Sequence, residues 1–278
     1  MEEIIRFNNS NNYFTFISNN NDISPLVIIV PGGGYHHTSK REAFNVASYF
    51  LNLGFKCAVL NYREQIDIYP EPQKELGEMI DYFRNNQNKY DLNGKILGIG
   101  FSAGAHLLLS ETNYYNEFQQ CKPVDGVIAC YPVVSSDFSF GHLRSFATLL
   151  NGFDSNNPMI TNEEAIELLN SFKENNDPRY PLIDKLSIEK HLRNDFPEIF
   201  IWHTFTDESV NVLNSLKLIE ACKKNNINVE AHVFPRGAHG MSLCDDSMTQ
   251  GGTNHKDDYV AHWTSMLKDY LVLKGWIK

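Results

Sequence analysis

A serine stands between two glycines in the segment Gly100-Phe101-Ser102-Ala103-Gly104. The apolar residues 95–100 before it are typical of a strand buried on both faces of a parallel sheet. The alanines and leucines after it favour a helix. This order predicts a nucleophile elbow, in which a strained turn exposes the serine hydroxyl and small neighbours let strand and helix pass closely. The alternative is an ordinary strand-to-helix turn whose serine only caps the helix.

A nucleophilic serine needs a base to take its proton, and the base needs an anion to fix its tautomer. In a parallel sheet these partners should follow the carboxyl ends of later strands. Asp207 follows the predicted strand 198–202, and His239 follows the predicted strand 228–234. Ser102, Asp207 and His239 also occur in the chain order that this arrangement requires. We therefore expect these three residues to be catalytic.

Other acids and histidines are weaker candidates. Glu208, beside Asp207, is the main alternative acid. His106 lies four residues past Ser102 on the predicted helix, so it should point away from the site and serve packing or hydrogen bonding. His203 precedes the loop of Asp207 and is expected to stabilise it.

Residues 31–35 (PGGGY) follow another apolar strand and predict an oxyanion hole, because glycines let a loop aim several amides at one point. The expected donors are the amides of Gly33, Gly34 and Ala103. Tyr35 and His36 are expected to contact the substrate, and His37 could also line the pocket. The alternative is a phosphate-binding loop, but neither a Walker lysine nor a completed G-x-G-x-x-G follows.

The net charge of −10 over 278 residues argues against a nucleic-acid or anionic-membrane partner. The sequence as given has no signal-like start and no run of eighteen apolar residues, so we expect a soluble, cytoplasmic protein. The scattered cysteines lack the spacing of a zinc site or a disulfide framework. These cysteines are Cys57, Cys121, Cys130, Cys222 and Cys244. The oligomeric state stays open, a homo-oligomer included.

Alternating strand and helix patterns predict an α/β fold, a three-layer αβα sandwich with a mostly parallel sheet, as one domain over residues 1–278. Strands are expected at 3–7, 13–17, 26–30, 55–61, 95–100, 126–131, 198–202 and 228–234. Helices are expected after Ser102 and at 41–53, 71–88, 163–172, 209–224 and 257–274. The buried face of the predicted helix 41–53 should be formed by Phe44, Ala47, Phe50 and Leu51. Residues 133–195 interrupt the alternation and are expected to form a lid or cap.

These motifs together resemble the α/β-hydrolase superfamily, specifically its small intracellular acetyl esterase and carbohydrate (acetyl xylan) esterase-like branch. The resemblance runs from about residue 26 to the end and includes residues 187–191 (SIEKH) and 234–240 (FPRGAHG). It implies a serine esterase that removes small acyl groups, in particular acetyl, from sugars or xylo-oligosaccharides without a cofactor. Its partner would be a small-molecule ester, such as an acetylated oligosaccharide.

The resemblance has one notable departure and leaves alternatives open. Many relatives begin the glycine motif with histidine, whereas this chain has Pro31, so the hydrogen bonds that shape the loop must come from elsewhere. The alternative activity is that of an amidase or peptidase on the same fold, such as an arylformamidase-like hydrolase. A further alternative is a ligand-binding protein that retains the fold without the chemistry.

Overall fold

The computed structural model describes all residues of the chain except Asn9, 63–67, 153–158 and 253–254. Its strands are β1 (Glu2–Arg6), β2 (Tyr13–Ile17), β3 (Ser24–Val30), β4 (Lys56–Asn61), β5 (Leu92–Phe101), β6 (Gly126–Cys130), β7 (Ile199–Thr204) and β8 (Val229–Phe234). Its α-helices are α1 (Phe44–Asn52), α2 (Glu71–Asn85), α3 (Ala103–Asn113), α4 (Tyr115–Phe118), α5 (Leu143–Asn151), α6 (Asn162–Glu174), α7 (Tyr180–Lys185), α8 (Ile188–His191), α9 (Leu213–Lys224) and α10 (His262–Leu273). Two short 3₁₀ helices are η1 (Lys40–Glu42) and η2 (Asp246–Gly252).

The strands form one eight-stranded sheet in the order β1-β2-β4-β3-β5-β6-β7-β8. β2 runs antiparallel to both of its neighbours. The other strands, β4, β3, β5, β6, β7 and β8 in sheet order, pair in parallel. The carboxyl ends of these parallel strands share one edge, so the loops after β3, β5, β7 and β8 meet there. The predicted α/β fold with a mostly parallel sheet is confirmed.

Helices cover both faces of the sheet, and β3 shows why. Its residues are fully buried, and alternate side chains enter two separate apolar clusters. Leu26, Ile28 and Val30 pack in the cluster that holds residues of α2, α3 and α9. Val27 and Ile29 pack in the cluster that holds residues of α1 and α10. Each such aliphatic side chain contributes about 1.5–3 kcal/mol of hydrophobic stabilisation, so this central strand anchors the sandwich.

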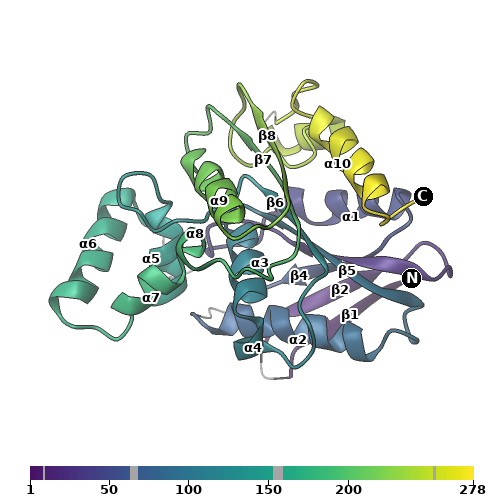
Figure 1. The fold of residues 1–278 in the computed structure, drawn as a ribbon, viewed down its shortest axis with the longest axis horizontal. Coiled ribbons are helices and arrows are strands. Elements are labelled where there is room, and N and C mark those ends of the chain that lie inside the picture. The colour runs from purple at the N-terminus through teal and green to yellow at the C-terminus, as the bar shows by residue number, and fades with distance from the viewer. Residues whose placement is uncertain (9, 63–67, 153–158, 253–254) are drawn as a thin grey trace.

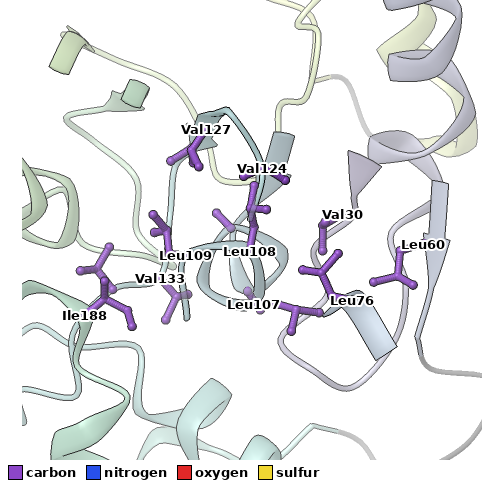
Figure 2. Close-up of a cluster of buried hydrophobic side chains, with 14 of the residues drawn as sticks. Val30, Leu60, Leu76, Leu107, Leu108, Leu109, Val124, Val127, Val133 and Ile188 are labelled. Carbon is purple, nitrogen blue, oxygen red and sulfur yellow. The ribbon is translucent and has the colours of Figure 1, made fainter. Parts of the chain in front are cut away.

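Helix α3, which follows Ser102, is embedded in the first cluster. Figure 2 shows it end-on, with Leu107 on the side of Leu76 and Leu109 on the side of Val133 and Ile188. All eleven residues of α3 are buried. The segment that carries the serine is therefore held rigidly from several directions.

The first predicted helix differs from the observed one. Lys40–Glu42 forms η1, and α1 begins at Phe44 after an irregular residue, Ala43. The prediction that Phe44 is buried was wrong, because its side chain is 48% exposed. The buried face of α1 is centred on Val46, Ala47 and Phe50, and Phe44 lies outside that stripe.

The connection between β6 and β7 contains the excursion expected at residues 133–195. Its described residues form the four helices α5 to α8, whereas the sequence predicts a helix only near 163–172. α6 covers that segment and begins with a capping box between Thr161 and Glu164. Helices α5, α6 and α7 lie together at one side of the molecule, away from the far edge strand β1 (Figure 1). No helix in the described part of the chain is long and apolar enough to cross a membrane.

Candidate active site

Ser102 occupies a strained turn between β5 and α3. Its backbone has φ 53° and ψ −120°, a conformation that costs free energy and persists only where the surroundings enforce it. The flanking glycines are required by close packing. A Cβ atom at Gly100 would lie 2.6 Å from Ala105 Cα, and one at Gly104 would lie 2.2 Å from the carbonyl oxygen of Val30. The local geometry is therefore that of a nucleophile elbow.

The structure brings Ser102, His239 and Asp207 together from three separate loops. His239 Nε2 lies 2.8 Å from Ser102 Oγ, and His239 Nδ1 lies 2.7 Å from Asp207 Oδ2. The Asp207 side chain is fully buried, whereas the imidazole keeps 23% of its surface exposed. Such a chain of hydrogen bonds lets the imidazole accept the serine proton while the carboxylate stabilises the resulting cation.

The surroundings of Asp207 keep it ionised. Burial on its own would raise the pKa of this carboxyl, but hydrogen bonds from His203 and His239 lower it well below its usual range. Asp207 Oδ1 also accepts hydrogen bonds from the amides of Ser209 and Val210, both at 2.9 Å. The carboxylate is thus fixed in position as well as in charge.

His203 supports this loop, as the sequence indicated. Its imidazole is completely buried, and Nε2 lies 3.0 Å from the carbonyl oxygen of Val210 and 3.3 Å from Asp207 Oδ2. Nδ1 lies 2.7 Å from Ser215 Oγ. A protonated Nε2 satisfies both oxygens, so His203 ties Asp207 to the end of β7 and the start of α9.

The glycine loop begins with Pro31, where the family resemblance implies a histidine, and other groups shape it. Glu42 Oε2 accepts a hydrogen bond from the Gly32 amide at 2.8 Å, and the Tyr62 hydroxyl donates to the Pro31 carbonyl at 2.8 Å. Gly33 and Gly34 have φ of +127° and +64°, values that side chains disfavour. A buried carboxylate and a buried tyrosine therefore replace the missing histidine.

Three main-chain amides near the serine are free to donate a hydrogen bond to a bound group, as far as the described residues show. Within the described part of the chain, the amides of Gly33, Gly34 and Ala103 donate no hydrogen bond. Gly33 and Gly34 line the same cavity as Ser102, and Ala103 is the first residue of α3. The N-terminus of a helix carries a partial positive charge, which favours an anion at this point.

The cavity at Ser102 has a volume of about 190 Å³. Its other lining residues include His37, Arg41 and Glu42, and the β6–β7 connection contributes a further group. That group consists of His142, Arg144 and Met159. The sequence predicted that this connection covers the site but assigned none of these last three residues to the cavity, because nothing in the connection indicated which side chains turn inward.

The expected substrate contacts need correction. Tyr35 is completely buried, and its hydroxyl lies 2.7 Å from His106 Nδ1, so it packs behind the glycine loop and does not line the cavity. His36 is not among the lining residues, whereas His37 is. On the other side of its ring, His106 Nε2 lies 2.9 Å from the carbonyl oxygen of Leu186. This agrees with the hydrogen-bonding role expected of His106.

Comparison with known proteins gives the family. The BD-FAE family model matches residues 15–222, which is most of the chain. The chain belongs to the BD-FAE family. BD-FAE is a family of carboxylesterase and acetyl esterase hydrolases with the α/β-hydrolase fold.

Solved structures similar to this family member cover its whole length. The acetyl ester-xyloside bifunctional hydrolase from Caldicellulosiruptor lactoaceticus is 29% identical with a TM-score of 0.77, covering 99% of this chain and 97% of that one. A sugar hydrolase from Lactococcus lactis is 28% identical with a TM-score of 0.76, covering 99% and 98%. The carboxylesterase Cest-2923 from Lactobacillus plantarum is 21% identical with a TM-score of 0.77, covering 100% and 98%, and supports the fold.

A curated relative extends beyond this chain. Endo-1,4-beta-xylanase B of Butyrivibrio fibrisolvens is 30% identical over 218 residues, which are 74% of this chain and 30% of that protein. The chain therefore corresponds to less than a third of that relative.

Proposed function

We propose that this esterase removes small acyl groups, chiefly acetyl, from sugars or xylo-oligosaccharides, with Ser102, His239 and Asp207 as its catalytic triad. The observation that carries the proposal is the unbroken hydrogen-bond chain from Ser102 Oγ through His239 to Asp207, at 2.8 and 2.7 Å. It gives the serine a base, and it gives the base an oriented anion.

The proposed reaction has two steps. Ser102 Oγ attacks the ester carbonyl carbon while its proton passes to His239 Nε2, and the tetrahedral intermediate then expels the alcohol, which takes that proton. The acyl-enzyme is cleaved by water, whose proton again goes to His239, and the acid leaves as Ser102 regains its hydrogen. Water is the only co-reactant, and Asp207 remains a carboxylate throughout.

The negative charge of each tetrahedral intermediate is proposed to rest on the amides of Gly33, Gly34 and Ala103. These amides have no other acceptor among the described residues, and Glu42 and Tyr62 fix the loop that presents two of them. Donors held in place before the reaction stabilise the transition state without the cost of reorganisation.

The preference for small acyl groups is supported by Met159. A Cβ atom at Gly34 would lie 2.4 Å from Met159 Cε, so the thioether end presses against the oxyanion loop. Little room remains there for a long acyl chain, and the whole cavity measures about 190 Å³. We propose in addition that residues 133–195 act as a lid, since His142, Arg144 and Met159 all reach the cavity from this connection.

The sugar portion of the substrate is proposed from similarity. The Caldicellulosiruptor relative is named an acetyl ester-xyloside bifunctional hydrolase, and the Lactococcus relative a sugar hydrolase. Both exceed 25% identity over nearly the full chain.

The test is a substrate panel of acetyl, butyryl and octanoyl 4-nitrophenyl esters, acetylated xylo-oligosaccharides and formylkynurenine. We expect release of acetate from the oligosaccharides and a decline in kcat/KM with acyl length, both abolished in Ser102→Ala. Faster turnover of formylkynurenine than of any acetyl ester would favour the amidase alternative. Unchanged activity of Ser102→Ala would refute the mechanism.

A further inference from the structure

Two arginines line the cavity at Ser102 and have no acidic partner among the residues that the structure describes. Arg41 lies on η1, and Arg144 is the second residue of α5. Neither takes part in an ion pair among the described residues, and Nε of each is buried without a hydrogen-bond partner. An arginine that lines a cavity without an acidic partner can form charged hydrogen bonds with an anion that enters the cavity.

The acidic residue that lines the cavity, Glu42, already accepts hydrogen bonds from other parts of the protein. Glu42 Oε2 accepts from the Gly32 amide at 2.8 Å, and Glu42 Oε1 accepts from the Tyr131 hydroxyl at 2.6 Å. Both of its oxygens are therefore engaged, one by the glycine loop and one by the residue that follows β6. Asp207 is engaged by His239 and does not line the cavity.

The histidine beside Arg144 also cannot neutralise it. His142 Nε2 lies 3.3 Å from Arg144 Nη2, and His142 Nδ1 lies 2.8 Å from Ser145 Oγ. Burial, followed by the charge of Arg144, lowers the pKa of His142 to about 3, so this imidazole is neutral at pH 7. Arg144 therefore has neither His142 nor a described carboxylate as a counter-ion at the cavity wall.

Arg41 lies next to the catalytic machinery. A Cβ atom at Gly240, the residue after His239, would lie 3.2 Å from Arg41 Nη2. The chain as a whole carries a net charge of −10. Two guanidinium groups without an ion pair among the described residues therefore line the cavity of a chain whose overall charge is negative.

We propose that Arg41 and Arg144 bind a carboxylate carried by the ester substrate, which makes anionic esters preferred over neutral ones of the same shape. A guanidinium presents paired donors that match the two oxygens of a carboxylate, and such charged hydrogen bonds are stronger than neutral ones. The inference rests on the proposed function, because it assigns specificity to the same cavity. Since Met159 restricts the acyl side, the carboxylate belongs on the alcohol portion, as in an acetylated sugar acid.

Two matched substrate pairs test this and separate the sources of the carboxylate. On the alcohol side, 4-acetoxybenzoate is compared with 4-acetoxybenzamide. On the acyl side, mono(4-nitrophenyl) glutarate is compared with 4-nitrophenyl pentanoate. Each kcat/KM is divided by the rate of alkaline hydrolysis of the same ester, to remove differences in intrinsic reactivity. The proteins are the wild type, Arg41→Gln, Arg144→Gln, the double variant and the control Arg236→Gln.

Arg236 makes a suitable control because its side chain is 72% exposed and does not line the cavity. Arg236→Gln removes one positive charge, as Arg41→Gln and Arg144→Gln each do. We expect the wild type and the control to favour the carboxylate of the alcohol pair about tenfold or more, mainly through KM. The double variant should lose that preference. Preference in the acyl pair alone would overturn the assignment to the alcohol side.

The ratio that decides is the normalised kcat/KM of the carboxylate ester divided by that of its neutral partner. If this ratio is the same in the wild type and the double variant, the proposal as a whole is overturned. The neutral esters report separately on the proposed function. If the wild type cleaves them and the ratios do not move, the esterase assignment stands and only the role of the arginines fails. If no ester is cleaved, the proposed function itself fails.

Discussion

Glu42 Oε2 lies 2.8 Å from the Gly32 amide nitrogen, so a buried carboxylate holds the glycine loop that faces Ser102. The same carboxylate accepts from the Tyr131 hydroxyl, whose ring packs edge-on against His239 with centroids 5.0 Å apart. Glu42 therefore connects the proposed oxyanion loop with the surroundings of the proposed base.

Glu42→Ala should lower kcat by about tenfold or more with a smaller change in KM, because it loosens donors that act mainly in the transition state. It should also lower the free energy of unfolding by roughly 1–3 kcal/mol, since buried donors lose their acceptor. Steady-state kinetics and urea unfolding measure the two effects. Glu42→Gln is the matched control, because its amide can still accept from Gly32 and donate to Tyr131. An Ala variant with wild-type kcat would remove Glu42 from this positioning role.

Met159→Ala should shift the acyl preference toward longer chains. Removing the thioether opens space beside Gly34, so the ratio of butyryl to acetyl kcat/KM should rise several-fold over the wild type. Met248→Ala is a control, because Met248 is buried away from the cavity. A ratio that does not change in Met159→Ala would place the acyl group elsewhere.

The buried His142 should make the protein sensitive to acid. Its pKa is lowered to about 3, against about 6.5 in the unfolded chain, so between these values the unfolded state binds a proton that the folded state does not. Stability is then lost as pH falls from about 6.5 toward 3, at up to about 1.4 kcal/mol per pH unit. His142→Gln should reduce the slope of unfolding free energy against pH in urea titrations. Parallel slopes in both proteins would show that His142 does not contribute.

Ser102→Ala and His239→Ala should each lose nearly all kcat, and the double variant should lose little more. Residues that act as one unit give strongly non-additive losses. The 4-nitrophenyl acetate assay measures this, with melting temperatures as a check that each variant folds. Losses that simply multiply would mean that one of the two residues acts outside the triad.

The elements that bear Ser102, Asp207 and His239 were predictable because each follows an apolar strand, and parallel strands bring their carboxyl ends to one edge. Tyr35 was misplaced because sequence spacing does not reveal a backbone turn with φ +60°, after which its side chain lies in the core. Arg144 and Met159 could not be assigned, since their approach depends on packing between segments far apart in the chain. Helix α5 did carry a helical spacing of Leu143, Phe146, Ala147 and Leu150, a signal that could have located it.

We propose that Ser102 is the nucleophile and that His239 activates it. This proposal is tested most directly by treating the protein with a 4-nitrophenyl alkylphosphonate and locating the adduct by peptide mass spectrometry. We predict one stoichiometric adduct on Ser102, greatly slowed labelling in His239→Ala, and none in Ser102→Ala. An adduct on another residue, or labelling of His239→Ala at the wild-type rate, would contradict the account.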